Sequence, residues 1–139
     1  MTTARVMVTG FGMTTPVGGD AASTWAALLR GRSGVREMTG PAFDGLPVRI
    51  AAPVAAEPAE LIGRGERRRW DRGQQLAVVA ARQAWADAGF RGAADGCGLD
   101  PERVAVVVGT GIGGITSTLA HYDEFREHGW THLSPYTVT

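Results

Sequence analysis

The sequence predicts an α/β fold in which short apolar strands alternate with helices. Two observations support this prediction. Residues 104–108, V-A-V-V-V, lead into the glycine-rich turn G-T-G-I-G-G at 109–114, and R-V-M-V-T-G at 5–10 also runs into a turn. Consecutive β-branched residues are typical of a strand covered on both faces. Because each run precedes a segment of helical periodicity, we expect helices flanking a mixed sheet in layers.

Composition limits the chain to one globular unit without a strong overall charge. The apolar content of 44% is enough for one hydrophobic core, and a length of 139 residues is too short for two ordinary domains. Fourteen arginines balance fourteen acidic residues, so no net field favours nucleic acid or an anionic membrane. The single cysteine, Cys97, cannot form an internal disulfide, and no targeting pattern or membrane-length apolar run is present. We therefore expect a cytoplasmic protein.

The first helix and the strand after it have clear boundary signals. Asp20 is a suitable N-cap for a helix whose apolar residues follow helical spacing, and Gly31 is placed to end it. Residues 48–54, V-R-I-A-A-P-V, alternate in the manner of a strand. Pro53 cannot donate a ladder hydrogen bond, so this segment is predicted to be an edge strand.

Two longer helices follow. The first is predicted over 66–88 and ends at Gly89; its middle, L-A-V-V-A-A at 76–81, is apolar on nearly every side, which predicts deep packing. The second follows the glycine turn. Its apolar face consists of Ile115, Leu119, Tyr122 and Phe125.

The glycine turn is compatible with two kinds of site. Gly109, Gly111 and Gly114 fit G-x-G-x-x-G between a strand and a helix, which would place a pyrophosphate at the helix N-terminus. A dinucleotide site also needs an acidic residue after the next strand, and residues 130–138 contain no Asp or Glu. Glycines equally suit a turn whose backbone closely approaches an acyl chain or another protein segment.

Neither Cys97 nor the histidines form a convincing catalytic or metal site. Asp95 and Asp100 flank Cys97, and negative neighbours raise the pKa of a thiol, which is the opposite of what a nucleophile needs. The chain has three histidines: His121, His128 and His132. Gly129 is expected to break the helix between the last two, and no second cysteine completes a metal site. We therefore expect no metal site.

A cluster of arginines between 64 and 72 allows two interpretations. Its members are Arg64, Arg67, Arg68, Arg69 and Arg72, offset only by Glu66 and Asp71. Such a run is usually a solvated helix face. The alternative is a docking patch for an acidic partner, whose carboxylates or phosphates the guanidinium groups would bind.

Seven segments in order resemble the β-ketoacyl-acyl-carrier-protein synthases of the thiolase-like fold. They are R-V-M-V-T-G-F-G-M-T-T-P-V-G from Arg5, S-T-W-A-A-L-L-R-G-R-S-G from Ser23, F-D-G-L-P-V-R-I-A from Phe43, E-R-R-R-W-D-R from Glu66, A-A-R-Q-A-W-A-D-A-G from Ala80, D-P-E-R-V-A-V-V-V-G-T-G-I-G-G from Asp100 and L-S-P-Y from Leu133. The resemblance implies the N-terminal part of a layered α-β-α-β-α fold.

The resemblance also implies a reaction, decarboxylative Claisen condensation of an acyl thioester with malonyl-acyl carrier protein in fatty-acid elongation. The family uses a nucleophilic cysteine and two histidines, and its nucleophile matches a position beyond Thr139. Cys97 and the three histidines match none of these groups. We therefore expect residues 1–139 to be a partial domain, truncated before the catalytic cysteine and inactive alone. Such a piece should expose apolar surface, and intact relatives are expected to be homodimers.

Two groups of site residues follow from the resemblance. Ile112 matches a bulky residue bordering the acyl channel, and Thr137 falls where relatives often carry an aromatic that reaches toward the partner subunit's pocket. The acyl carrier protein, with its phosphopantetheine-linked acyl and malonyl groups, would dock on a basic region matched by Arg64, Arg67, Arg68 and Arg69. Gly65 replaces a residue that is frequently basic in relatives.

Alternatives remain open at this point. Within the family, the chain is compatible with a type II polyketide ketosynthase or its chain-length factor. From other classes, it is compatible with a small carrier-protein-binding module or a Rossmann-like nucleotide binder.

Overall fold

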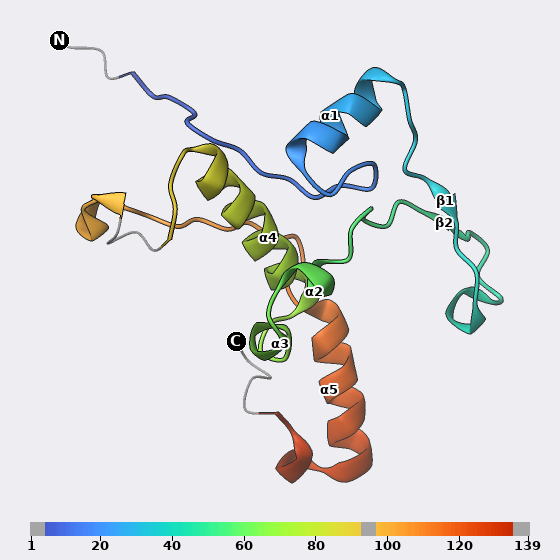
Figure 1. Cartoon of the computed structure of the whole chain (residues 1–139). Coiled ribbons are helices and arrows are strands. Elements are labelled where there is room, and N and C mark those ends of the chain that lie inside the picture. The colour runs from blue at the N-terminus through green and yellow to red at the C-terminus, as the bar shows by residue number, and fades with distance from the viewer. Residues whose placement is uncertain (1–4, 93–96, 135–139) are drawn as a thin grey trace.

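A computed structural model describes residues 5–92 and 97–134 of the chain (Figure 1). Helices predominate, and the one sheet among the described residues has two short strands. The elements in order are α1 (Ala21–Leu29), β1 (Arg36–Glu37), the 3-10 turn η1 (Pro41–Phe43), β2 (Ile50–Ala51), α2 (Pro58–Leu61), α3 (Arg64–Arg67), α4 (Arg72–Asp87), η3 (Pro101–Arg103), α5 (Ile115–His128) and η4 (Trp130–His132).

Helix α1 begins and ends where the sequence predicts. The backbone N–H of Ser23 donates to Oδ1 of Asp20 at 2.7 Å, and the backbone N–H of Asp20 donates back to Oγ of Ser23 at 3.3 Å. This reciprocal pair is a capping box. Gly31 follows the helix with φ of 63°, a conformation that favours glycine.

The N-terminal segment crosses α4 through two glycines. A Cβ atom on Gly12 would lie 2.2 Å from the carbonyl oxygen of Ala80, so only glycine fits this crossing. Next to it, the backbone N–H of Met13 donates to Oε1 of Gln83 at 3.0 Å. The Gln83 amide in turn donates to the carbonyl of Gly19 at 2.8 Å. These contacts hold residues 10–19 against α4.

The predicted helix over 66–88 is two helices. Helix α3 ends at Arg67, and α4 begins at Arg72 after Asp71, whose capping box starts a new helix. The predicted end is confirmed, because Gly89 has φ of 84°. The predicted deep burial of this helix is wrong, because within the described part of α4 only Gln75 and Val79 are buried.

The predicted edge strand is confirmed at its centre only. β2 covers two of the seven residues predicted, and it pairs antiparallel with β1. The backbone N–H of Met38 adds a hydrogen bond to the carbonyl of Arg49 at 2.7 Å. Figure 1 shows this hairpin projecting away from α4 and α5.

The two apolar runs predicted as strands are extended but unpaired. Residues 5–10 and 104–110 belong to no sheet in the described structure. Val106 and Val107 are 86% and 90% exposed, so the predicted covering on both faces is absent here. A strand needs a neighbour for its backbone groups, and none of the described segments supplies one. The structure confirms that the chain combines helices and strands, but the described residues form no layered sheet.

The surface area gives a measure of this incomplete packing. The chain exposes 11180 Å², whereas a compact monomer of 14.6 kDa exposes about 6900 Å². The excess agrees with the expectation that the chain exposes apolar surface. None of the helices in the described part combines the length and apolar character needed to cross a bilayer.

Helix α5 is confirmed, including its end. Gly129 has φ of 81° and its backbone N–H donates to the carbonyl of Phe125 at 2.9 Å, so the helix stops before η4. The predicted apolar face is largely exposed, and it consists of Ile115, Leu119, Tyr122 and Phe125.

Candidate functional site

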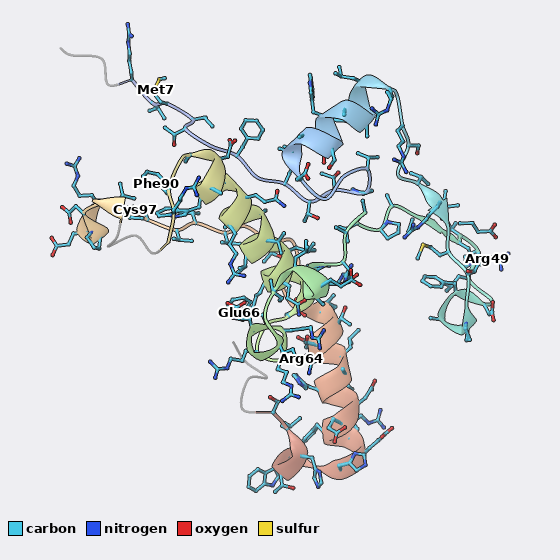
Figure 2. All side chains as sticks on the ribbon, in the orientation of Figure 1. Met7, Arg49, Arg64, Glu66, Phe90 and Cys97 are labelled. Atoms are coloured by element: carbon cyan, nitrogen blue, oxygen red, sulfur yellow. The ribbon has the colours of Figure 1, made fainter. Side chains whose placement is uncertain are left out.

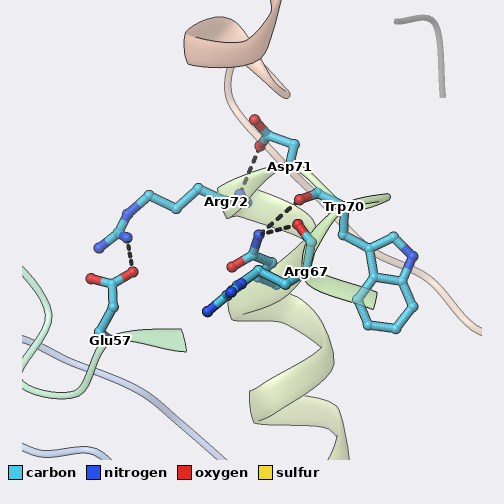
Figure 3. Close-up of polar contacts among 7 residues, drawn as sticks. Glu57, Arg67, Trp70, Asp71 and Arg72 are labelled. Carbon is cyan, nitrogen blue, oxygen red and sulfur yellow. Dashed lines mark hydrogen bonds and ion pairs between the residues drawn. The ribbon is translucent and has the colours of Figure 1, made fainter. Parts of the chain in front are cut away.

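The carboxylate of Asp71 lies at the N-termini of two helices, α4 and α5. Its Oδ1 accepts a hydrogen bond from the backbone N–H of Gly73 at 2.7 Å, and Asp71 N–H donates to Oε1 of Gln74 at 2.9 Å. Its Oδ2 accepts from the hydroxyl of Ser117, in the first turn of α5, at 2.7 Å. Figure 3 shows Asp71 at the start of α4. One side chain thus joins segments 46 positions apart.

Hydrogen bonding keeps Asp71 ionised. The hydroxyl of Ser117 lowers the pKa of Asp71 most, the N–H of Gly73 lowers it next, and partial burial opposes both. The backbone N–H groups of Arg72 and Ser117 lower it further. A carboxylate at two helix N-termini is also favoured by the helix dipoles. This carboxylate lies beside the helix start at which the dinucleotide alternative would place a pyrophosphate, and a negative charge there disfavours a second anion.

The glycine turn packs on Asp71 at one position. A Cβ atom on Gly114 would lie 3.0 Å from Cγ of Asp71, whereas Cβ atoms on Gly109 and Gly111 would meet nothing within 4 Å. Gly114 is also the N-cap of α5 and has no side chain to cap it. Within the chain, Gly114 is therefore the glycine of the turn that packs closely on Asp71.

The arginine segment, defined as residues 64–69, comprises α3 and the two residues after it. Oε1 of Glu66 accepts from the guanidinium of Arg82 on α4 at 2.6 Å. This hydrogen bond, followed by that from the N–H of Gly63, lowers the pKa of Glu66. The buried amide of Gln75 donates to the carbonyl of Trp70 at 2.8 Å and to that of Arg67 at 3.4 Å (Figure 3). The bonds to Glu66 and Arg67 hold the segment on α4.

All five predicted arginines are exposed. One of them, Arg72, also forms an ion pair with Glu57, the residue before α2 (Figure 3). The other four lie along the arginine segment: Arg64, Arg67, Arg68 and Arg69. The structure therefore leaves the four residues predicted for docking on the surface.

Two hollows adjoin Asp71. One, of about 270 Å³, is polar and lies between the arginine segment and α5; its lining includes Arg68, Arg69, Ser117 and His121. The other, of about 420 Å³, lies between α4 and the glycine turn and is lined by Leu76, Ala77, residues 108–110 and others. Asp71, Gln74 and Gly114 line both. The arginine segment and the glycine turn thus share one edge of the molecule.

The predicted channel residues are only partly described. Ile112 is 78% exposed and does not line either hollow. Thr137 lies outside the described residues. The structure therefore brings the arginine segment to the base of the glycine turn and leaves the tip of the turn, with Ile112, facing outward.

Cys97 and the histidines are not brought together into a reactive site. The Sγ–H of Cys97, in the loop after α4, donates to the carbonyl of Arg91 at 3.4 Å (Figure 2 labels Cys97). The His128 and His132 rings lie 5.5 Å apart at the end of α5, and Nδ1 of His128 is 3.4 Å from Oε1 of Glu124. Across residues 5–92 and 97–134, no three His, Cys, Asp or Glu residues are grouped for a metal ion.

The contacts of Asp71 at the starts of α4 and α5 are not among the features predicted from the sequence. The pattern D-R-G-Q at 71–74 is the signal of a capping box and predicts a helix start at that point. No comparable signal marks Ser117 as its partner, because the contact is made only in the folded chain.

Comparison with known proteins identifies the family. The family described as "Beta-ketoacyl synthase, N-terminal domain" matches residues 3–138. The chain is 35% identical over 135 residues to "3-oxoacyl-(acyl-carrier-protein) synthase 2" of Coxiella burnetii, and 37% over 136 residues to the protein of that name from Mycobacterium tuberculosis. It is 36% identical over 140 residues to "Tetracenomycin polyketide synthase ketoacyl synthase alpha subunit" of Streptomyces glaucescens.

In each of these alignments 96% of the chain is covered. The chain spans about a third of the length of these relatives, 32% in Coxiella and 31% in the other two. The match includes the glycine turn, Asp71 and the arginine segment. The chain therefore belongs to the beta-ketoacyl synthase family, and it corresponds to the N-terminal domain of that family.

Proposed function

We propose that the protein is a β-ketoacyl-acyl-carrier-protein synthase of fatty-acid elongation, and that this chain supplies its carrier docking edge and part of its acyl channel. The observation that carries the proposal is the shared edge around Asp71, where exposed arginines lie beside the glycine turn. Family membership and relatives named 3-oxoacyl-(acyl-carrier-protein) synthase 2 support the reaction class.

The reaction is a decarboxylative Claisen condensation. A cysteine thiolate attacks the thioester carbonyl of acyl-acyl carrier protein, the phosphopantetheine thiol of the carrier leaves, and the acyl group is held as a cysteine thioester. Malonyl-acyl carrier protein then loses CO₂ to give an enolate. The enolate carbon attacks the thioester carbonyl, the cysteine thiolate leaves, and 3-oxoacyl-acyl carrier protein forms. Cys97 is not proposed as this nucleophile, because no described histidine activates it. The chain alone is expected to catalyse no condensation.

The arginine segment is proposed as the docking surface for acyl carrier protein. Its exposed guanidinium groups are planar donors that suit carboxylates and phosphates, and clustered charge of one sign speeds encounter with an oppositely charged partner. The contributing residues are Arg64, Arg67, Arg68 and Arg69. Gly65 leaves a gap without charge in the middle of this surface.

The glycine turn is proposed as one wall of the acyl channel. Ile112 is its one bulky side chain, and the hollow of about 420 Å³ lies between the turn and α4. A branched side chain at this position would limit which acyl chains fit. Thr137 is proposed to border the same channel, where its small side chain would leave room; this part of the proposal rests on the resemblance alone.

The proposal extends to the fold and assembly of the whole enzyme. Residues 5–10 and 104–108 would be strands of a thiolase-like α-β-α-β-α core, which would cover their exposed valines. The enzyme would be a homodimer acting in the cytoplasm without metal or redox cofactor.

Docking is tested with the protein attached sparsely to a sensor surface, so that copies do not meet, and titrated with acyl carrier protein bearing phosphopantetheine. The charge reversal Arg68→Glu with Arg69→Glu should weaken binding by at least about tenfold. The control Arg30→Glu with Arg32→Glu makes the same charge change after α1, which Figure 1 shows apart from α3. Equal affinity in both variants would remove the docking role.

A second candidate is an aromatic-polyketide ketosynthase. It is favoured by one observation, the 36% identity to the Streptomyces glaucescens subunit, which is close to the identity with the synthase 2 relatives. A preference for a polyketide carrier over a fatty-acid carrier in the same titration would favour this candidate.

A further inference from the structure

We propose that Asp71 is a positioning residue that fixes the docking arginines to the glycine turn, because its one carboxylate caps α4 and also accepts from the hydroxyl of Ser117 in the first turn of α5. This inference rests on the proposed function for its consequence, carrier binding. Its structural content, one joint between two segments, stands independently of that function.

The first step is that Asp71 needs both of its oxygens. Oδ1 is used by the backbone N–H of Gly73, and Oδ2 by the hydroxyl of Ser117, each at 2.7 Å. A serine has one side-chain oxygen, which can still accept from the N–H of Gly73 as an N-cap but leaves no second acceptor for Ser117. An asparagine is unsuitable, because its NH₂ could donate to the Ser117 hydroxyl. Asp71→Ser therefore preserves the cap of α4 and removes the contact to Ser117.

The second step is that the two segments meet directly at Asp71. Gly114, the N-cap of α5, has no side chain to cap the helix. A Cβ atom at Gly114 would lie 3.0 Å from Cγ of Asp71, so the turn is seated directly on the carboxylate. On the other side, Asp71 directly follows Trp70, whose carbonyl accepts from the Gln75 amide at 2.8 Å. The arginine segment is therefore rigid on α4, and Asp71 joins it to the turn.

The third step connects this joint to docking. The polar hollow of about 270 Å³ is lined on one side by Arg67, Arg68 and Arg69 and on the other by residues of α5 such as Ser117. A carrier that binds the arginines also meets the first turns of α5. If the joint opens, the two sides of the hollow separate, and a partner that needs both loses contacts.

The joint is tested by the distance distribution between spin labels at Gly65→Cys and Ile112→Cys in a Cys97→Ser background. The parent should give a narrow distribution and Asp71→Ser a broad one. Asp20→Ser, which changes a carboxylate capping only α1, is the control and should stay narrow. Ser117→Ala should broaden the distribution like Asp71→Ser while leaving the α4 cap intact. A narrow distribution in both Asp71→Ser and Ser117→Ala would overturn the inference.

The connection to docking is tested by combining variants. Asp71→Ser should weaken carrier binding about fivefold, the size of effect that one such contact has on stability. In the Arg68→Glu, Arg69→Glu background it should produce a clearly smaller loss, because two of the arginines that Asp71 positions no longer attract the carrier. A full fivefold loss in that background would overturn the positioning role. If the arginine variant leaves carrier binding unchanged while Asp71→Ser broadens the distances, the proposed function fails and the joint remains.

Discussion

The junction around Asp71 and the two extended apolar segments show opposite outcomes in one chain. At the junction, the carboxylate of Asp71 and the amide of Gln75 find partners within the chain, although the buried Nδ1 of His121 on α5 finds none among the described residues. Residues 5–10 and 104–110 find no strand partner in the described structure, and Val107 is 90% exposed. A cap needs only one or two polar groups that lie close in the folded chain. A buried strand needs hydrogen-bonded neighbours on both sides and packed side chains on both faces.

The largest effect expected from this contrast is self-association. Val106→Lys with Val107→Lys should sharply reduce the association of the protein at high concentration, because the exposed apolar run drives it. Leu46→Lys with Val48→Lys adds the same charge on the hairpin and should have little effect. Sedimentation velocity measures both. A parent that stays monomeric throughout would show that the exposed strands are not adhesive.

A glycine at the crossing of the N-terminal segment should give the largest loss of stability from one substitution. Gly12→Ala places a Cβ atom 2.2 Å from the Ala80 carbonyl, so the segment must move, at a cost of about 3 kcal/mol. Gly65→Ala, where a Cβ atom meets nothing within 4 Å, is the control. Urea unfolding followed by circular dichroism, in the Val106→Lys, Val107→Lys background, gives both values. Equal stability in the two variants would mean that the segment does not pack on α4.

The ionised state of Asp71 predicts how the junction responds to acid. Its pKa is lowered in the folded protein, so its stabilisation is complete above its ordinary value of 3.8 and is lost as pH falls through the folded pKa. The stability difference between the parent and Asp71→Asn, about 1 kcal/mol at pH 7, should therefore shrink below pH 3.8. Urea unfolding at stepped pH measures it. A difference that is constant down to pH 2 would contradict the assignment.

The smallest effect is expected in the glycine turn. Gly114→Ala would press its Cβ atom against Asp71 and should cost about 1 kcal/mol. Gly111→Ala has nothing within 4 Å of the added atom and should leave stability unchanged. Thermal melts of the two variants are compared directly. If Gly111→Ala proves as destabilising as Gly114→Ala, the turn is not seated on Asp71 as described.

The sequence predicted those features whose cause is local. Asp20 and Ser23 mark the start of α1 within four residues, and Gly31, Gly89 and Gly129 end their helices because of their own backbone conformation. The exposed arginines and the family were also predicted from contiguous patterns.

Features that depend on distant partners were not predicted. The helix over 66–88 was expected to be continuous because good helix formers run through 66–69, and the capping signal at Asp71 competes with them. The contact from Asp71 to Ser117 spans 46 positions, and the pairing of β1 with β2 involves strands too short to show a period. The covering of residues 104–108 requires strands that no described segment provides.

The central claim, that the arginine segment and the glycine turn form one docking edge, is tested most directly by hydrogen exchange on binding acyl carrier protein. With the protein kept below the concentration at which it self-associates, the account predicts slowed exchange in residues 64–70 and, together with it, in residues 113–118. Slowed exchange confined to the β1–β2 hairpin, or to 64–70 with 113–118 unchanged, would contradict it.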